Sequence, residues 1–542
     1  MARTHPDHTT GVRNATLGVA AALALFAGSA NAQTFQRFNG TGLTEKAWDI
    51  ESLEDGGYVT AGERTGIFGI PGGPPDVADM LVTRYDATGK PVWATQVGGF
   101  MRDVAYSVDR TMDGGFIVAG MTESVGTTLG LSLTKLGPGG TVAWSFAYPG
   151  DVFGELTNPA PDGTPPQVAV RESESGDIIA ITNFANTVGG QAGVYVRTTP
   201  TGAPIVQASY IDPALELRSR VSFADLKELP GGDILITGFY ELPDGNPFGV
   251  PADADILTMR LTPSGAPVWA FANGEPIGMA MEAGYGIDID PAGERFVVGA
   301  ATDKGGATLA TAHLWFDSAG ALLFNNDVTG TAPAYSATRY NDAADVATAG
   351  QNFFLPGAGM HGTAAGVSFD AGGAPLWLYT YGPNVIPRDR AAAVAPTDAA
   401  GVCGWIFAGW ERYPLAPGAE DQHLIKVNDF GMSGCCEDER PLDPDVPFIE
   451  QRPLQIQQIP HQVFEPWGAW EPIDLIDVVK CQSPDCTPCP ADLNGDGALN
   501  VDDIDAFVAA FLAGEALADL VCDGVLNVDD IDAFIAAFLA GC

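Results

Sequence analysis

Positive charge is scarce in this chain. Lysine and arginine together number 26 against 68 aspartates and glutamates, which gives a formal net charge of −42 for 542 residues. A surface with that balance repels phosphate backbones, so binding to nucleic acid is disfavoured. Charged residues make up only 17% of the chain and hydrophobic residues 46%, which excludes a largely disordered protein and provides material for more than one core.

Recognisable catalytic motifs are also missing. The six histidines show no ligand-type spacing such as HExxH, and there is no convincing G-x-S-x-G elbow or phosphate-binding glycine loop. Hydrolysis of a polysaccharide needs two carboxylates that face each other across a pocket. With 68 acidic side chains, such a pair is neither excluded nor located by the sequence. Any catalytic residues are therefore unknown.

A long apolar segment able to cross a membrane is absent after the N-terminus. Residues 1–32 predict a secretory signal peptide. Arg3 and Arg13 precede the apolar stretch Leu17–Gly28, and Ala-Asn-Ala at residues 30–32 fits a small-x-small cleavage site. We therefore expect an exported protein, extracellular or at the cell surface, with no transmembrane segment.

Cysteine is limited to eight residues, and in an exported protein these favour disulfides over free thiols. We prefer a disulfide from Cys403 to Cys435 or Cys436, because all three fall in the last repeat of the body described below. The remaining pairings stay open. Whether Cys542 is free, bridged or an attachment point is open as well.

Glycine and proline, by contrast, are abundant, with 67 and 40 residues, and much of the glycine recurs at intervals. Asp55–Gly62 (DGGYVTAG) returns as Asp113–Gly120 (DGGFIVAG), with weaker copies farther along. A Gly-containing pair between two alternating apolar runs predicts a β-hairpin. In each copy a second turn follows, of the form Gly-x-x-x-Trp or a degenerate version. Its glycines are Gly89, Gly140, Gly202, Gly265, Gly320, Gly373 and Gly431.

This pattern predicts four short strands in each of seven repeats. Seven such units without helical periodicity predict a seven-bladed β-propeller over residues 33–436. The pattern resembles exported bacterial propeller repeats, which implies architecture and not activity. The glycines are interpreted as turn residues and the tryptophans as packing between neighbouring blades. The segment Thr34–Gly40 is predicted to supply the missing fourth strand of the last blade, because open sheet edges invite aggregation.

One turn, Asp86–Trp93, resembles the tryptophan-docking motif of quinoprotein propellers. Only this repeat carries the full motif, and packing between blades explains the segment without a cofactor. We therefore expect no cofactor-binding residues in the body.

The composition changes over residues 437–489. Seven prolines fall between residues 441 and 472, mixed with acids and glutamine, and they predict an extended, Pro-rich linker. Apolar and aromatic residues between 463 and 470 indicate that part of it lies along the body. The linker ends in a cysteine cluster that favours disulfides, although a zinc knuckle also fits. The cluster consists of Cys481, Cys486 and Cys489.

Residues 490–542 carry a duplicated motif. Asn500–Gly514 and Asn527–Gly541 differ at one position only, Val508 against Ile535. Each copy follows a loop with oxygen ligands at the spacing of a calcium-binding loop. The predicted ligands of the first loop are Asp492, Asn494, Asp496, the carbonyl of Ala498, Asn500 and Asp503. Those of the second loop are Asp519, Asp523, the carbonyl of Val525, Asn527 and Asp530.

The second loop departs from the pattern, because Val521 replaces Asn at position 3, and we expect weaker calcium binding there. Each loop leads into a predicted helix, and calcium is expected to supply much of the folding energy of this small domain. The two helices are predicted to bury apolar faces against each other. These faces are Ile504, Phe507, Val508, Phe511 and Leu512, and then Ile531, Phe534, Ile535, Phe538 and Leu539.

A pair of calcium loops, each followed by one helix, resembles a dockerin, and the final Gly-Cys resembles a bacterial subset of dockerins. The resemblance implies docking to a cohesin-like partner or anchoring at the cell surface. In cellulosomal dockerins, positions 10 and 11 of each loop help to select the partner. Here these positions are Val501, Asp502, Val528 and Asp529. Because the two pairs are identical, they suit two related binding orientations.

Two functions remain for the whole chain. The first is a non-catalytic exported propeller, attached to the cell surface or to an assembly through the calcium-dependent tail. The second is a polysaccharide-acting propeller enzyme, a glycoside hydrolase or lyase, carried by the same tail. A carbohydrate is the expected class of ligand for the propeller. The first function is favoured, because repeat signatures occur in every unit and catalytic motifs do not.

Overall fold

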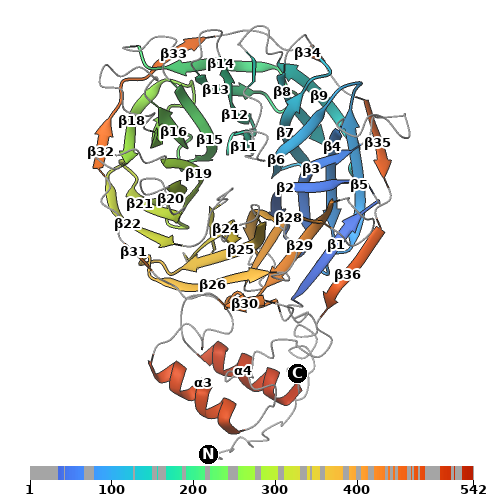
Figure 1. Ribbon diagram of the computed structural model, residues 1–542, viewed down its shortest axis with the longest axis vertical. Coiled ribbons are helices and arrows are strands. Elements are labelled where there is room, and N and C mark those ends of the chain that lie inside the picture. Colours follow the sequence, from blue (N-terminus) through green and yellow to red (C-terminus); the bar gives the residue numbers. More distant parts are fainter. Residues whose placement is uncertain are drawn as a thin grey trace, which may run out of the picture.

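The structure is a computed structural model of the chain. It describes residues 34–41, 43–65, 78–125, 129–148, 155–156, 167–185, 191–213, 220–241, 254–274, 282–302, 310–329, 338–341, 345–354, 361–381, 390–397, 404–412, 420–433, 437–439, 444–445, 450–460, 465–466, 469–473, 476–482, 501–513, 518 and 528–540. The fold is mainly β, with two helices near the C-terminus, α3 (Val501–Ala513) and α4 (Val528–Ala540) (Figure 1). Within the described ranges, no helix is both long and apolar enough to cross a membrane. The predicted signal peptide lies outside them.

In the part of the chain that the structure describes, the body consists of seven four-stranded antiparallel units, and six of these are meanders of consecutive strands. Units 3 and 4 belong to one sheet, because Gln191 and Arg220 join them by a parallel pairing. Units 1 and 2 are β2 (Glu45–Ser52), β3 (Tyr58–Thr65), β4 (Ala78–Tyr85) and β5 (Pro91–Gly98), and then β6 (Asp103–Arg110), β7 (Phe116–Thr122), β8 (Gly130–Leu136) and β9 (Val142–Tyr148). Units 3 and 4 are β11 (Ala169–Glu172), β12 (Ile178–Ala185), β13 (Gln191–Thr198) and β14 (Pro204–Ile211), and then β15 (Arg220–Glu228), β16 (Ile234–Glu241), β17 (Ala254–Leu261) and β18 (Pro267–Gly274). Units 5 and 6 are β19 (Glu282–Ile289), β20 (Arg295–Thr302), β21 (Ala310–Asp317) and β22 (Leu322–Thr329), and then β23 (Thr338–Tyr340), β24 (Val346–Phe354), β25 (His361–Phe369) and β26 (Pro375–Tyr381). The two-residue strand β10 (Glu155–Leu156) also pairs with β12.

The units follow one another around a ring (Figure 1). The first strand of each unit contacts the first strand of the next, from β2 through β6, β11, β15, β19 and β23 to β27 (Arg390–Pro396), and β27 contacts β2. First strands therefore surround the centre, and fourth strands form the rim. The hydrophobic cores lie between neighbouring units: one cluster joins Ile256 of unit 4 to Phe296 and Leu314 of unit 5.

Unit 7 is completed by a strand from the other end of the chain. After β27 come β28 (Trp405–Arg412) and β29 (Glu420–Val427), and the fourth strand is β1 (Phe35–Gly40). β1 runs antiparallel to β29, with Phe35 opposite Lys426. The predicted pairing of the N-terminal strand with the last repeat is confirmed.

The predicted turns are present, and they explain the tryptophans. All seven glycines of the Gly-x-x-x-Trp turns have a positive φ, between 76° and 88°, which residues with a Cβ rarely adopt. Trp93 of unit 1 lies under the turn of unit 2, where a Cβ on Gly140 would come within 2.7 Å of its ring. Trp93 Nε1 also donates to the carbonyl oxygen of Pro138 at 3.1 Å. In unit 7 the ring of Phe35 takes this place under Gly89.

Residues 437–482, which we call the strap, add a fifth strand to every unit (Figure 1). In chain order its strands are β30 (Glu437–Glu439) on β26, β31 (Pro444–Asp445) on β22, β32 (Glu450–Pro453) on β18, β33 (Gln457–Pro460) on β14, β34 (Glu465–Pro466) on β9, β35 (Ala469–Ile473) on β5 and β36 (Ile476–Gln482) on β1. All seven pairings are antiparallel. The described parts of the strap thus make one complete circuit of the rim.

The strap changes the interpretation of the Pro-rich linker. The prediction that it is extended and lies in part along the body is confirmed, but its described residues are paired strands and not a spacer. Each strand from β31 to β35 contains a proline. Proline has no N–H group, so it is tolerated on a strand that is paired on one side only, and it offers no donor to a further strand. The prolines therefore mark the outermost edge of the sheets.

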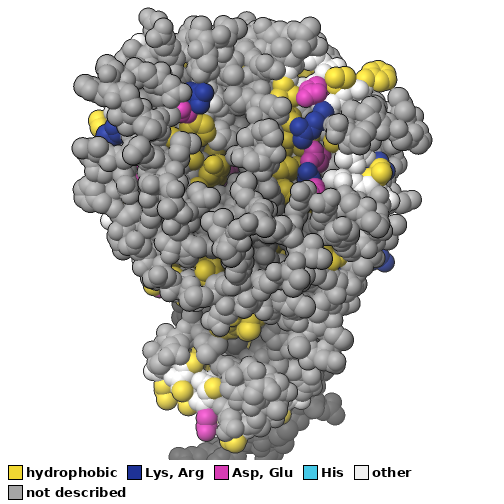
Figure 2. Space-filling model, viewed as in Figure 1, with side chains coloured by type: hydrophobic (Ala, Val, Ile, Leu, Met, Phe, Trp, Pro, Cys, Tyr) yellow, Lys and Arg dark blue, Asp and Glu magenta, His cyan; other side chains and the backbone are white. Residues whose placement is uncertain are grey.

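α3 and α4 pack against each other, but along a narrower stripe than predicted. The rings of Phe507 and Phe534 stack with centroids 4.3 Å apart and planes 10° apart. Ile504, Val508 and Leu512 are also predicted on the buried face, yet they are 37%, 47% and 80% exposed. That part of the prediction is wrong, because a single partner helix covers only the residues nearest the line of contact. Figure 2 shows hydrophobic side chains on this helical part, at the lower end of the view.

The close approach of Trp93 to Gly140 gives a first prediction. Gly140→Ala places a Cβ on a positive φ and against the ring, and we expect it to lower the free energy of unfolding by roughly 1–3 kcal/mol. Gly139→Ala is the matched control, since a Cβ there meets nothing within 4 Å. Urea unfolding followed by tryptophan fluorescence measures both. Equal midpoints for the two variants would contradict this account of the turn.

Candidate functional site

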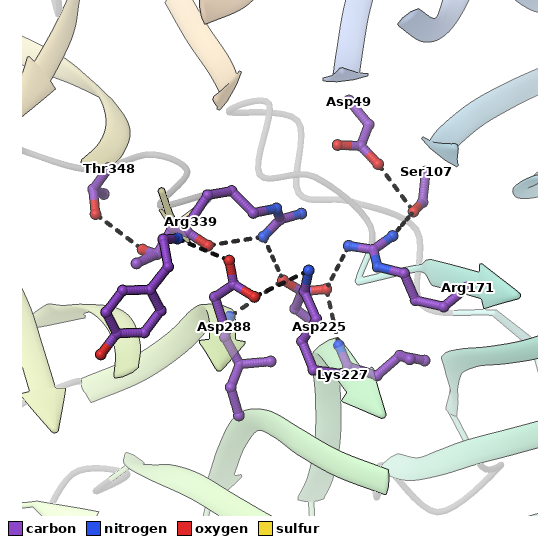
Figure 3. A network of polar contacts seen from close by, with 12 residues as sticks. Asp49, Ser107, Arg171, Asp225, Lys227, Asp288, Arg339 and Thr348 are labelled. Carbon is purple, nitrogen blue, oxygen red and sulfur yellow. Dashed lines mark hydrogen bonds and ion pairs between the residues drawn. The ribbon is translucent and has the colours of Figure 1, made fainter. Parts of the chain in front are cut away.

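The first strands carry a bulge at an equivalent place in five of the described units. Register shifts lie beside residue 48 in β2, 106 in β6, 224 in β15, 285 in β19 and 392 in β27. A bulge bends the strand and re-aims the side chains that follow it. In three units the next residue is polar: Asp49, Ser107 and Asp225. These three side chains meet in a polar network, drawn in Figure 3.

We call this network the central cluster. Its members are Asp49, Ser107, Arg171, Asp225, Lys227, Asp288 and Arg339, and they come from the first strands of units 1 to 6. All except Lys227 are less than one-tenth exposed. The cluster therefore brings six units together through side chains that are largely removed from water.

Asp225 is the centre of the cluster. Its Oδ1 lies 3.4 Å from Arg171 Nη2 and its Oδ2 lies 3.0 Å from Arg339 Nη1. Backbone N–H groups of Leu226 and Ile287 also donate to its carboxylate, at 2.8 and 3.2 Å. Burial opposes ionisation, but the two arginines outweigh it and hold the pKa of Asp225 below its usual value. The carboxylate is therefore charged and shared by units 3 and 6.

A second ion pair extends the cluster towards unit 5. Lys227 Nζ lies 3.0 Å from Asp288 Oδ1, and the backbone N–H of Tyr340 donates to Asp288 Oδ2 at 2.8 Å. Units 4, 5 and 6 are joined by this one carboxylate. Charged pairs with several hydrogen bonds tolerate burial better than isolated charges do.

Acidic groups collect on the side of units 1 and 2. Asp49 Oδ2 accepts from Ser107 Oγ and from the backbone N–H of Val108, both at 3.0 Å. Burial raises the pKa of Asp49, with a further contribution from Glu51 and against the opposing effect of Arg171 and Arg339. Burial likewise raises the pKa of Asp109 to about 6. The carboxyl groups of Asp49 and Asp109 are therefore the ones in this region that take up a proton most readily.

The predicted loop residues that the structure describes differ in their exposure to solvent. Asp503 and Asp530, at position 12 of the two loops, are fully buried at the start of α3 and α4, whereas Val501 and Val528 are 64% and 62% exposed. The other predicted ligands lie outside the described residues: Asp492, Asn494, Asp496, Ala498, Asn500, Asp519, Asp523, Val525 and Asn527. The side chains of Asp502 and Asp529 lie outside them as well.

The described part of the tail contains two carboxylates that are buried at equivalent positions. Asp503 and Asp530 are buried at equivalent positions of two helices, next to the stacked Phe507 and Phe534. Among the described residues, no group of three or more acidic, histidine or cysteine side chains is placed to hold a metal.

The sequence did not reveal the central cluster. Its residues alternate with buried apolar ones on short strands and form no known motif. The signal that could have found them is the register of the repeats. Asp49 and Glu51 flank Ile50, Ser107 and Asp109 flank Val108, and Asp225 and Lys227 flank Leu226 in the same way. Aligning the first strands on that apolar residue predicts a ring of polar positions.

Comparisons with known proteins find only distant structural likeness. No family model and no curated protein matches the sequence. A protein of unknown function from Dyadobacter fermentans has a TM-score of 0.37 and 12% identity, over 62% of this chain and 97% of that one. The plexin A4 extracellular region has a TM-score of 0.45 and 7% identity, over 73% of this chain and 51% of that one. A PL25 ulvan lyase has a TM-score of 0.39 and 12% identity, over 72% of this chain and 96% of that one. At these values the likenesses assign no function.

Removing the charge of Asp225 tests the cluster. Asp225→Asn keeps an acceptor for only one of the two backbone N–H groups, and it removes the carboxylate that lies against two buried guanidinium groups. We expect the free energy of unfolding to fall by roughly 3–5 kcal/mol. Asp233→Asn is the matched control: it breaks the half-buried pair with Arg260, 2.8 Å apart, and should cost less than about 1 kcal/mol. Chemical unfolding of the whole chain measures both, and similar losses would contradict the central role of Asp225.

Asp109→Asn tests the acidic side. Burial raises the pKa of Asp109 to about 6, so the folded chain holds a proton there that the unfolded chain releases near pH 4. Ionisation of Asp109 therefore lowers the free energy of unfolding of the parent as the pH rises from about 4 to about 6. Asp109→Asn has no ionisable group there and does not show this loss. We expect the variant to unfold at higher urea concentration than the parent at pH 7.5, with a smaller difference at pH 5. Both values lie above the pI of about 4.1.

Asp113→Asn is the control of opposite sign. Although partial burial opposes it, the hydrogen bond from Lys135 lowers the pKa of Asp113 to about 2. The charged form is stabilising here, so this variant should unfold slightly earlier at pH 7.5. If both variants shifted the midpoint in the same direction, the assignment of Asp109 as a raised carboxyl would fail.

Proposed function

We propose that this protein is a seven-bladed β-propeller held at a cell surface or in an assembly by a calcium-dependent, dockerin-like tail. The propeller part rests on the cycle of first strands from β2 to β27 and back to β2. Turn glycines and aromatic rings recur between neighbouring units and support the same architecture. The body is the cargo, and the tail is the part that binds.

The observation that carries the proposal is the internal symmetry of the tail. α3 and α4 have nearly the same sequence, and each begins beside a fully buried aspartate, Asp503 or Asp530. Equivalent phenylalanines, Phe507 and Phe534, form the contact between the helices. Calcium bound by loops that end at these aspartates would fix the start of each helix. Folding of the tail, and thus attachment, would then depend on calcium.

The outer surface of the helices suits a protein partner. Equivalent apolar residues are exposed to nearly the same extent: Val501 and Val528 at 64% and 62%, and Leu512 and Leu539 at 80% and 79%. Apolar side chains exposed at equivalent places on both helices suit contact with a protein partner. A cohesin-like partner could bind either helix through the same contacts, with Val501, Asp502, Val528 and Asp529 among them.

A structural role for the body is supported by the central cluster. Asp225 is held by two arginines and Asp288 by Lys227 and a backbone N–H, so both carboxylates are engaged in ties between units. A hydrolase acting on polysaccharide needs carboxylates that face a substrate. These interactions favour the non-catalytic function over a glycoside hydrolase or lyase.

Calcium titration of the whole chain tests the proposal. Asp503→Asn removes a ligand of the complete loop, and we expect the calcium Kd of that loop to rise at least about tenfold. Asp530→Asn, in the loop that has Val521, should reduce total calcium binding less. Asp505→Asn changes the same charge on an exposed position of α3 and should leave both sites intact. Calorimetry that finds no calcium binding to the parent chain would overturn the proposal.

A further inference from the structure

The ring is closed in unit 7 by two strands that lie far apart in the sequence. In the other six units a short turn connects the third strand to the fourth, so the two strands are covalent neighbours. In unit 7 the corresponding strands are β29 and β1, and they come from opposite ends of the chain. Their pairing closes a loop of nearly the whole body, which costs more conformational entropy than closing a hairpin.

β1 is nevertheless a fully buried strand. Phe35 and Phe38 are 1% and 2% exposed, and Gln36 and Asn39 are not exposed at all. Gln36 Nε2 donates to Ser433 Oγ at 3.0 Å, a contact that joins β1 to the residues after β29. One long edge of β1 pairs with β29, and the other edge is covered by β36, the last strand of the strap.

The strap pairs with more residues of β1 than of any other described strand that it covers. Six residue pairs join β36 to β1, from Phe35 opposite Gln482 to Gly40 opposite Ile476. Five pairs join β35 to β5, and the earlier strap strands have between two and four. β36 contains no proline, whereas each strand from β31 to β35 contains one. Its backbone can therefore donate along its whole length.

We infer that the strap is a latch for the ring: its last strand holds β1 in unit 7, so that the ring stays closed only while the strap is seated. Without β36, β1 would be a terminal strand held along one edge, and terminal strands fray unless they are tied down. The segment that leads to the helical tail would thereby also keep the ring of the body closed. Closure of the ring and seating of the tail-bearing segment are then one event.

Hydrogen exchange on the whole chain tests the latch. Val478→Pro combined with Val479→Pro interrupts β36, and because consecutive residues of a strand direct their N–H groups to opposite sides, one of the two prolines must remove a donor to β1. We expect amides of Phe35–Gly40 to exchange at least about tenfold faster in this variant. Unchanged protection of β1 would overturn the proposal.

The matched control interrupts the strap elsewhere. Gln457→Pro combined with Gln458→Pro breaks β33 on β14, which stays joined to β13 by a turn. The latch predicts that β14 remains protected in this variant and that β1 is unaffected. Faster exchange of β14 to the same extent as β1 would show that the strap covers every unit equally and latches none.

A measurement on the parent chain keeps the test decisive if the first variant does not fold. In native-state exchange at increasing urea below the unfolding transition, the latch requires β1 and β36 to open together, with the same dependence on urea. If β36 loses protection at low urea while β1 stays protected up to global unfolding, the ring closes without the strap and the inference is wrong.

Discussion

Backbone hydrogen bonds at the edges of the sheets govern the architecture of this protein. A four-stranded sheet has two edges, and unpaired N–H and C=O groups along an edge either meet water or attract another strand. Here the inner edges approach one another around the centre, and the outer edges are covered by the strap. One extended segment thus pairs with the outer edge strand of all seven units. Its prolines leave little for another strand to pair with, which limits edge-to-edge association between molecules.

The same constraint explains why charge is concentrated where water is scarce. First strands converge on the centre, and the bulges bring polar side chains such as Asp49 and Asp225 together there. Apolar side chains would fill the centre without specifying which unit lies next to which. Asp225, with Arg171 and Arg339 from units 3 and 6, makes a tie that depends on the correct arrangement of three units. Buried ion pairs contribute little net stability, so we interpret these as determinants of which units assemble side by side.

Local signals in the sequence predicted much of the body. Turn glycines such as Gly140 need a positive φ, and four of the seven turns are followed by a tryptophan that packs under the turn of the next unit. Both features can be recognised within a single repeat. Phe35 could be assigned to unit 7 because its strand matches the strand of Trp93. The strap and the central cluster could not be read in this way. The strap has no motif of its own, and its partners lie from about 60 to about 450 positions away in the sequence. The prolines that are typical of an edge strand are also typical of a spacer. The cluster appears only when six first strands are placed side by side.

In the tail, the apolar periodicity predicts the two helices correctly but not which of their side chains are buried. Five apolar positions on each helix predict a broad buried stripe, and both helices form. Of these ten apolar positions, Phe507 and Phe534 are buried, while Val508, Leu512 and their equivalents in α4 remain exposed. A helix needs more than one neighbouring element to bury a stripe that wide. In the described structure, α3 and α4 provide one neighbour for each other. The excess apolar surface is matched between the copies, with Val508 and Ile535 both 47% exposed. The two helices differ in sequence only at this position, so the surface that α3 exposes is repeated almost unchanged on α4.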